Sequence, residues 1–101
     1  MIEVNRLLLQ KLKTYIGFSL KNRSIIIGSD AILSYQRTGI VIYRNDLSEN
    51  ILRKIKNKRN DSILIELTKD EWDSLGLKKD SIKIVMITDK NMIEEIKRYI
   101  K

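Results

Sequence analysis

The chain has 101 residues, 43% of them hydrophobic, and a net charge of +7, a composition that predicts one globular domain over residues 1–101. It contains no Cys and no His, which excludes disulfides, Cys/His zinc sites and any catalytic triad with a histidine base. No apolar run is long enough to span a bilayer, and the N-terminus lacks the basic-then-apolar order of a signal peptide, so we expect a cytoplasmic protein outside the membrane.

Apolar periodicity and capping residues predict helices that alternate with strands. Helices are expected over about 3–20, 29–38 and 47–59, in a short segment after Thr68, and from Thr88 or Asp89 to about Ile100. Strands are expected over 25–27, 40–43, 63–67 and 82–87. Such alternation predicts a layered α/β domain with a largely parallel sheet and helices on both of its faces. Gly17, inside the first helix, is expected to mark a close packing contact.

The stretch 23–39 is the part of the chain that we expect to carry the functional site. Gly28 follows a run of three isoleucines and permits a sharp turn between a strand and a helix. Ser29 or Asp30 is expected to cap that helix, and Gly39 is expected to end it. The turn would leave free backbone N–H groups and a positive helix end at the surface, where an anion could bind.

Capping residues and one tryptophan support the later elements. Asp46 or Ser48 is expected to cap the helix over 47–59. Thr68 and Glu71 have the spacing of a capping box at the start of the short fourth helix. Trp72, in that helix, is interpreted as a core anchor, with base stacking as the alternative.

The charge is uneven along the chain. Residues 1–60 hold 12 Lys and Arg against 4 Asp and Glu, whereas residues 61–101 hold 8 against 9. A basic half beside a neutral half indicates a polyanionic partner, although a basic, Lys-rich proteome would give the same bias. Lys21 and Arg23, directly before the glycine turn, either contact phosphate or are solvated loop charges. The basic outer face of the helix over 47–59 is interpreted as solvated rather than as an RNA contact.

Three segments resemble one known family. Residues 15–28, Y-I-G-F-S-L-K-N-R-S-I-I-I-G, resemble the pattern L-L-G-L-A-R-R-A-G-K-L-V-S-G without a gap. Residues 40–50, I-V-I-Y-R-N-D-L-S-E-N, resemble L-V-L-I-A-S-D-A-S-E-N, and residues 82–89 resemble the final strand and its terminal T-D. The family is the bacterial YlxQ-like branch of the kink-turn RNA-binding ribosomal protein L-seven-Ae superfamily. The resemblance covers about residues 8–100.

The resemblance implies a three-layer α-β-α sandwich around a four-stranded mixed sheet. It also implies binding of a structured RNA, typically a kink-turn, which is a sharply bent helix, internal loop and helix. In the family, a G-x-N-E-x-x-K pattern at the start of the second helix reads sheared G·A pairs, and a loop before the last strand packs on flipped nucleotides. This agrees with RNA recognition through shape, backbone and splayed bases.

The reader pattern is only partly present. Gly28 matches the glycine and Ser29 the small residue after it. Asp30 stands in place of the Asn, Ala31 in place of the Glu and Ser34 in place of the Lys. Asp30 cannot donate a hydrogen bond as Asn does, Ala31 can make none, and Ser34 lacks the cation. The short basic segment that the family usually inserts before the second strand is also absent. The departures favour the alternative that the fold is kept while kink-turn recognition is lost.

The sequence therefore predicts a small non-catalytic RNA-binding protein of ribosomal type, without cofactor or metal and monomeric. Its partners would be a structured RNA, with ribosomal RNA as one candidate, and other ribosomal proteins. The alternatives are a protein-interaction module and an enzyme, for which no catalytic constellation is visible. The residues expected to contact RNA are Lys21, Arg23, Gly28, Ser29, Asp30, Ser34 and Arg37, with a second contact loop at Lys78, Lys79, Ser81 and Ile82.

Overall fold

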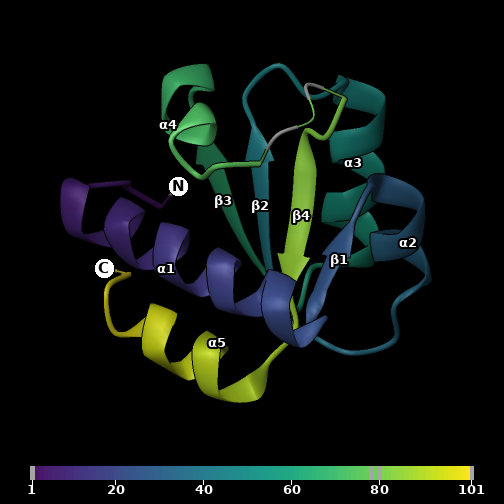
Figure 1. The fold of residues 1–101 in the computed structure, drawn as a ribbon. Helices are drawn as coiled ribbons and strands as arrows, with labels where there is room; N and C mark the ends of the chain where they lie inside the picture. Colours follow the sequence, from purple (N-terminus) through teal and green to yellow (C-terminus); the bar gives the residue numbers. More distant parts are fainter. Residues whose placement is uncertain (1, 78, 80, 101) are drawn as a thin grey trace.

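The computed structural model describes residues 2–77, 79 and 81–100, and within them it contains five helices and four strands (Figure 1). The helices are α1 (Arg6–Asn22), α2 (Ser29–Ser34), α3 (Glu49–Lys58), α4 (Lys69–Asp73) and α5 (Lys90–Lys97). The strands are β1 (Ile25–Ile27), β2 (Ile40–Arg44), β3 (Ile63–Leu67) and β4 (Ile84–Ile87). No helix in this described part is long and apolar enough to cross a membrane.

The four strands form one mixed sheet in the order β1-β4-β2-β3. Strands β2 and β3 are parallel, while β4 runs antiparallel to both β1 and β2. The mixed sheet is confirmed, but the expectation of a largely parallel sheet is wrong. A parallel connection needs a crossover of about a dozen residues or more. Helix α4 has only 5 residues and stays beside the end of β3, so the chain enters β4 from that end and runs in the opposite direction.

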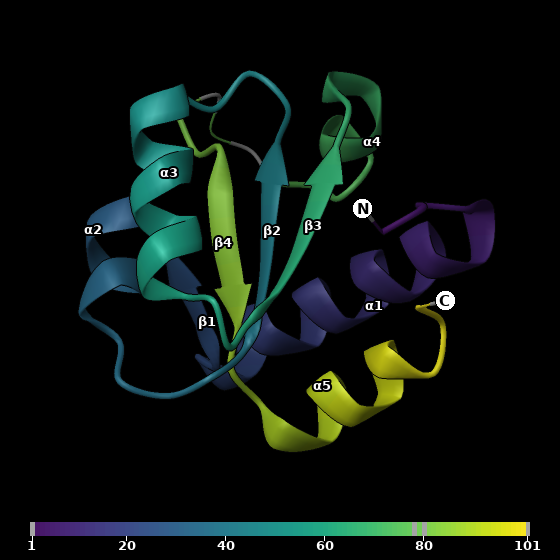
Figure 2. The same cartoon turned by 180° about the vertical axis from the view of Figure 1, so that it is seen from behind.

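Helices cover both faces of the sheet, so the α-β-α sandwich is confirmed (Figures 1 and 2). Alternate residues of β2 belong to separate cores: Ile40 and Ile42 pack with α1, α4 and α5, whereas Val41 and Tyr43 pack with α2 and α3. This division follows from the alternation of side chains along a strand. Strand β4 is divided between the two cores in the same way.

Helix α2 is shorter than predicted. It ends at Ser34 rather than near residue 38, and Gly39 does not cap it. Gly39 instead directly precedes β2. A Cβ at Gly39 would lie 2.6 Å from the carbonyl oxygen of Ile87 and 2.7 Å from Cε of Met86. The glycine is needed there because two strands approach each other closely, which is a requirement of tertiary packing and not of a helix end.

The structure confirms some predicted caps and contradicts others. The Thr68–Glu71 capping box is present, and Asp89 caps α5 by accepting a hydrogen bond from the Met92 N–H at 3.0 Å. The N-cap of α2 is Gly28, so neither Ser29 nor Asp30 caps that helix.

At α3, a predicted residue occupies the N-cap position but makes no capping hydrogen bond. The N-cap is Ser48, whose side chain makes no capping hydrogen bond, and the Asp46 carboxylate is bonded to Arg44 instead. Asp46 lies two residues before the N-cap, and its carboxylate is held by charge-assisted hydrogen bonds from the Arg44 guanidinium.

Two further expectations have clear outcomes. Trp72 is 2% exposed and belongs to the core beneath α1, so it is a core anchor and offers no face to a base. Gly17 is exposed, and a Cβ added to it would meet nothing within 4 Å. The expected packing contact at Gly17 is therefore wrong.

Candidate functional site

The turn between β1 and α2 is held by a glycine in a conformation that favours glycine. Gly28 has a φ of 93° and is the N-cap of α2. Its N–H donates to the Ile84 carbonyl at 3.2 Å, and its carbonyl accepts from the Ile32 N–H at 3.2 Å. One residue thus starts α2 and ties the turn to the beginning of β4.

A shallow hollow of about 560 Å³ lies beside this turn, between the end of α1 and the segment before β4. We call it the apolar hollow. Its lining residues are Leu20, Ile27, Gly76, Leu77, Lys79, Ser81 and Ile82. The structure therefore brings Lys79, Ser81 and Ile82, the described part of the predicted second contact loop, next to the glycine turn. Lys78, which was predicted with them, lies outside the described residues.

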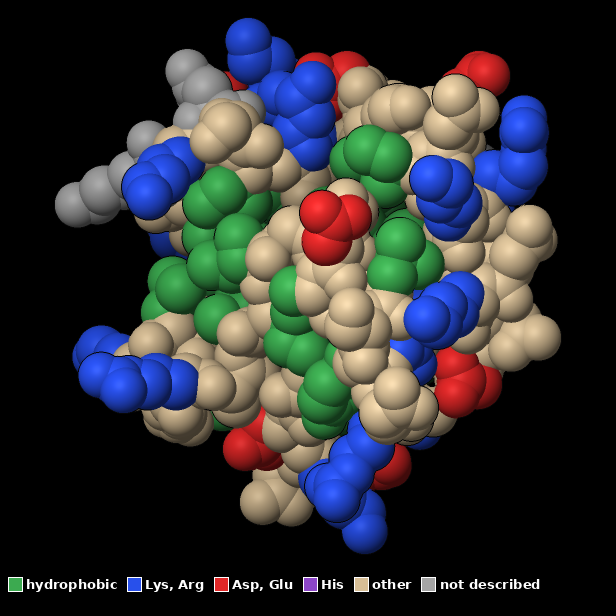
Figure 3. Space-filling model, turned by 90° about the vertical axis from the view of Figure 1, so that its right-hand side faces the viewer, with side chains coloured by type: hydrophobic (Ala, Val, Ile, Leu, Met, Phe, Trp, Pro, Cys, Tyr) green, Lys and Arg blue, Asp and Glu red, His purple; other side chains and the backbone are tan. Residues whose placement is uncertain are grey.

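The surface here is not a continuous basic groove. Figure 3 shows hydrophobic side chains gathered on this face, with Lys and Arg side chains around its margin. Leu20 is 44% exposed and Ile27 is 42% exposed, and both line the apolar hollow together with Lys79. Exposed apolar side chains that border a hollow and are flanked by charged residues are a candidate binding surface.

Apart from the Ser29 hydroxyl, the side chains of α2 offer no free hydrogen-bond donor toward a ligand. Asp30 and Ala31 are exposed, and Asp30 is the only acidic residue of the helix. The Ser34 hydroxyl donates to the Asp30 carbonyl at 3.0 Å, so its proton is used within the helix. The predicted readers Asp30 and Ser34 are thus close to the glycine turn, but they lack the free donors of the family pattern.

Lys21 and Arg23 lie at the other end of β1. Arg23 is the C-cap of α1 in the left-handed conformation, with φ 59° and ψ 33°. The carbonyl of the next residue, Ser24, accepts hydrogen bonds from Thr88 at the far end of β4. Because Ser24 and the three residues of β1 lie between Arg23 and Gly28, the two basic residues are separated from Gly28 by roughly 16 Å or more along the chain.

Arg37 lies apart from the apolar hollow. It lines a second hollow, formed by the connection between α2 and β2 on one side and by Thr88 and one face of α5 on the other. Sequence reasoning missed the residues of α5 that share this place with Arg37. They are more than 50 residues away along the chain and meet it only because Ile40 pairs with Ile87. The basic residue Lys90, directly after a predicted cap, was the only available signal.

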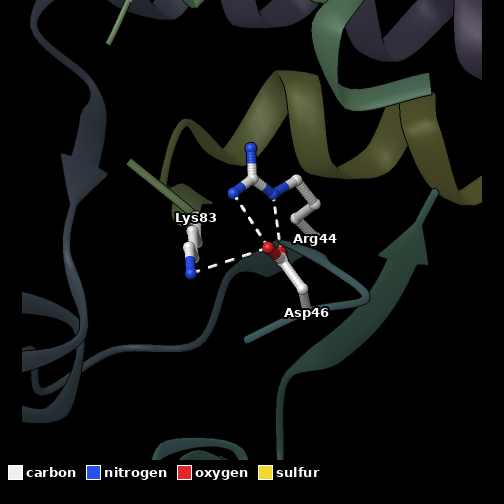
Figure 4. Close-up of polar contacts among 3 residues, drawn as sticks. All are labelled: Arg44, Asp46 and Lys83. Atoms are coloured by element: carbon white, nitrogen blue, oxygen red, sulfur yellow. Dashed lines mark hydrogen bonds and ion pairs between the residues drawn. The ribbon is translucent and has the colours of Figure 1, made fainter. Parts of the chain in front are cut away.

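An ion cluster braces the segment before β4 (Figure 4). The Arg44 guanidinium binds both carboxylate oxygens of Asp46, at 2.6 Å from Nε and 3.0 Å from Nη2. Lys83 Nζ lies 3.6 Å from the same carboxylate. The hydrogen bonds from Arg44 are the main reason why the pKa of Asp46 lies below its ordinary value. Burial, the next largest effect, opposes them, and the positive charges of Arg44 and Lys83 add to the lowering. The turn after β2 is thereby joined to the chain that enters β4.

Comparison with known proteins supports the fold and no more. No family model matches the chain, and no curated protein matches it. A solved structure described as a protein with unknown function from Bacillus halodurans C aligns with a TM-score of 0.71 and 12% sequence identity. The alignment covers 87% of this chain and 94% of that one, so the two share the fold over nearly their whole length.

Proposed function

We propose that the chain is a small, non-catalytic RNA-binding protein of ribosomal type that acts in the cytoplasm on a kink-turn or related structured RNA. One observation carries the proposal: the turn at Gly28 and the segment before β4, which the family resemblance implies as two RNA contacts, lie side by side at the apolar hollow. The net charge of +7 supports a polyanionic partner.

The combination of apolar side chains in the hollow and basic side chains at its margin suits RNA with unstacked bases. Proteins recognise such RNA by packing the faces of splayed bases on their side chains and by contacting the phosphate backbone. Leu20 and Ile27 would supply apolar contacts, while Lys79, Lys21 and Arg23 would supply phosphate contacts from the margin. Because Asp30 and Ala31 provide no donor for base edges, recognition would depend on RNA shape and on backbone groups.

A matched pair of leucines on α1 tests the proposal. Leu20 is 44% exposed and lines the apolar hollow, whereas Leu7 is 50% exposed and does not line it. Contacts with unstacked bases are worth about 1–3 kcal/mol each, so Leu20→Glu is expected to weaken binding of a fluorescent kink-turn RNA at least about fivefold. Leu7→Glu, which adds the same charge to the same helix, is expected to leave the affinity unchanged.

The comparison RNA is an unbent duplex of the same length and base composition. The affinity for the kink-turn should exceed that for the duplex and should fall as salt rises, because phosphate contacts release counterions. Equal affinity for the two RNAs at low salt, or equal effects of the two leucine variants, would contradict the proposal.

A second candidate is a protein-interaction module that keeps the fold without kink-turn recognition. The observation that favours it is the combination of the exposed apolar residues Phe18, Leu20 and Ile27 with the loss of a hydrogen-bond donor at Asp30 and of an acceptor at Ala31. Pull-down from a nuclease-treated and an untreated lysate distinguishes the candidates. A defined protein partner that persists after nuclease treatment, with no RNA enriched in the untreated sample, would favour the module.

A further inference from the structure

The hollow that contains Arg37 has a volume of about 270 Å³ and is separate from the apolar hollow. We call it the cationic hollow. The connection after α2 contributes Tyr35, Arg37 and Thr38 to it, and Thr88 with one face of α5, from Lys90 to Lys97, forms the opposite wall. Two hydrogen bonds from Thr88 to the Ser24 carbonyl, from its N–H at 3.1 Å and its hydroxyl at 2.6 Å, hold that wall against the start of β1.

Positive charge dominates the lining of the cationic hollow. Arg37, Lys90 and Lys97 are set against one carboxylate, Glu94. Lys97 Nζ lies 3.5 Å from Glu94, whereas the side chains of Arg37 and Lys90 form no ion pair with any residue in the described ranges. Asp89, next to Lys90, does not line the hollow, and its carboxylate is engaged in capping α5.

A buried arginine adds further positive charge behind this lining. Arg59 is 4% exposed and donates hydrogen bonds to two backbone carbonyls, those of Ile32 at 3.2 Å and Arg37 at 3.1 Å. Its guanidinium also lies 6.0 Å from the centroid of the Tyr35 ring, which faces the hollow. The two carbonyls accept from two of its five N–H donors, and no carboxylate of the described residues forms an ion pair with it. A buried charge without a counter-ion is costly, and an anion in the adjacent hollow would reduce that cost.

We propose that the cationic hollow binds a phosphate group. Its volume lies just below the range of about 300–1,000 Å³ that is usual for sites of drug-sized ligands, so a small, compact anion suits it. Arg37 presents the fork of donors that matches two phosphate oxygens, and Lys90 supplies a second cation. The Thr38 hydroxyl, which makes no hydrogen bond to a described residue, is available as a neutral donor.

The phosphate would belong to the backbone of the RNA bound at the apolar hollow, and this assignment rests on the proposed function. The carbonyl of Ser24, which anchors the cationic hollow, is four residues before Gly28 along extended chain, or roughly 13 Å. A strand of a few nucleotides that leaves the apolar hollow along the β1 edge would reach it. Inorganic phosphate has the same chemistry and is the other possible source.

Nuclear magnetic resonance with inorganic phosphate tests the site without any RNA. Phosphate is expected to shift the amide signals of Thr38, Thr88 and Lys90 in a saturable way at constant ionic strength. The double variant R37A/K90A should weaken that binding about tenfold. The matched control R53A/K56A, which removes one Arg and one Lys from the exposed face of α3, should leave it unchanged. Glu94→Gln should tighten it, because it removes the one carboxylate of the lining.

Absence of saturable shifts at these amides in the wild-type protein, or equal binding by wild type and R37A/K90A, would overturn the inference. The RNA arm distinguishes the source of the phosphate. If the RNA backbone occupies the hollow, R37A/K90A lowers the slope of log affinity against log salt by about 2, whereas the α3 control does not. If R37A/K90A binds RNA with the same slope of log affinity against log salt as wild type, the assignment of the phosphate to RNA fails while the proposed function stands. If no RNA binds and phosphate still does, the proposed function fails and the phosphate site stands.

Discussion

Gly17 and Gly39 differ in what a methyl group would meet. A Cβ on Gly39 would lie 2.6 Å from the backbone oxygen of Ile87, whereas one on Gly17 would meet nothing within 4 Å. Gly39→Ala is therefore expected to destabilise the protein by about 1–3 kcal/mol, because two strands must move apart. Gly17→Ala should stabilise it by up to about 1 kcal/mol through helix propensity. Urea unfolding of both variants checks this, and equal effects would contradict it.

Asp46 connects stability to pH. Its pKa is lowered in the folded protein, chiefly by the hydrogen bonds from Arg44, so it favours folding when ionised. The stabilisation is fully present above the ordinary aspartate pKa of about 3.9 and is lost as pH falls through the lower folded value. Asp46→Asn should therefore reduce stability at pH 7, with the difference from wild type disappearing in acid.

The measurement is urea unfolding of wild type and Asp46→Asn from pH 7 down to the lowest pH at which the protein is folded. Asp61→Asn is the control, because Asp61 is exposed and forms no ion pair with the described residues. A stability difference for Asp46→Asn that stays constant over the whole pH range would show that the carboxylate charge is not the cause.

At the scale of single helices, the N-caps of α3 and α4 differ in their hydrogen bonds. The Thr68 hydroxyl accepts from the Glu71 N–H at 3.2 Å, whereas the Ser48 side chain caps nothing. Thr68→Ala is expected to cost about 1 kcal/mol, and Ser48→Ala less than about 0.5 kcal/mol. Thermal unfolding followed by circular dichroism gives both values. A cost at Ser48 as large as that at Thr68 would contradict the assignment of the caps.

The same contrast explains which elements could be predicted from sequence. The Thr68 box and the Asp89 cap depend on residues within one turn, so local patterns sufficed. The end of α2 and the role of Gly39 depend on how closely β2 and β4 approach, which no local pattern contains. The antiparallel direction of β4 was not predicted for a related reason. It depends on where the short helix α4 packs, and the sequence pattern indicates only that the helix exists.

The candidate sites divide in the same way. The glycine turn was predicted because strand, glycine and helix follow one another in the chain. Its meeting with Lys79 and Ser81 was implied only by the family resemblance. The meeting of Arg37 with Lys90 follows from strand register, and the bond from Arg59 to the Arg37 carbonyl follows from tertiary packing, so neither was visible in the sequence.

At the scale of the whole molecule, the two cores share the central strands β2 and β4. Ile55 is buried in the core beneath α2 and α3, while Trp72 lies in the other core. Because the same two strands wall both cores, we expect them to unfold together. Ile55→Ala should destabilise the protein by about 2–5 kcal/mol, and the fluorescence of Trp72, the only tryptophan, should shift its midpoint as much as circular dichroism does. Separate midpoints would show that each core unfolds independently.

The left-handed backbone conformation of Arg23 lowers the stability of the fold, while its side chain supplies a positive charge for the proposed RNA contact. A residue with a side chain pays about 1–2 kcal/mol for this conformation, and glycine is the usual occupant of such a helix end. Arg23→Gly is therefore expected to raise the melting temperature while weakening RNA binding, and Arg23→Lys should change neither strongly. On stability alone glycine would suit this helix end better, and the positive charge of Arg23 is what that replacement would remove.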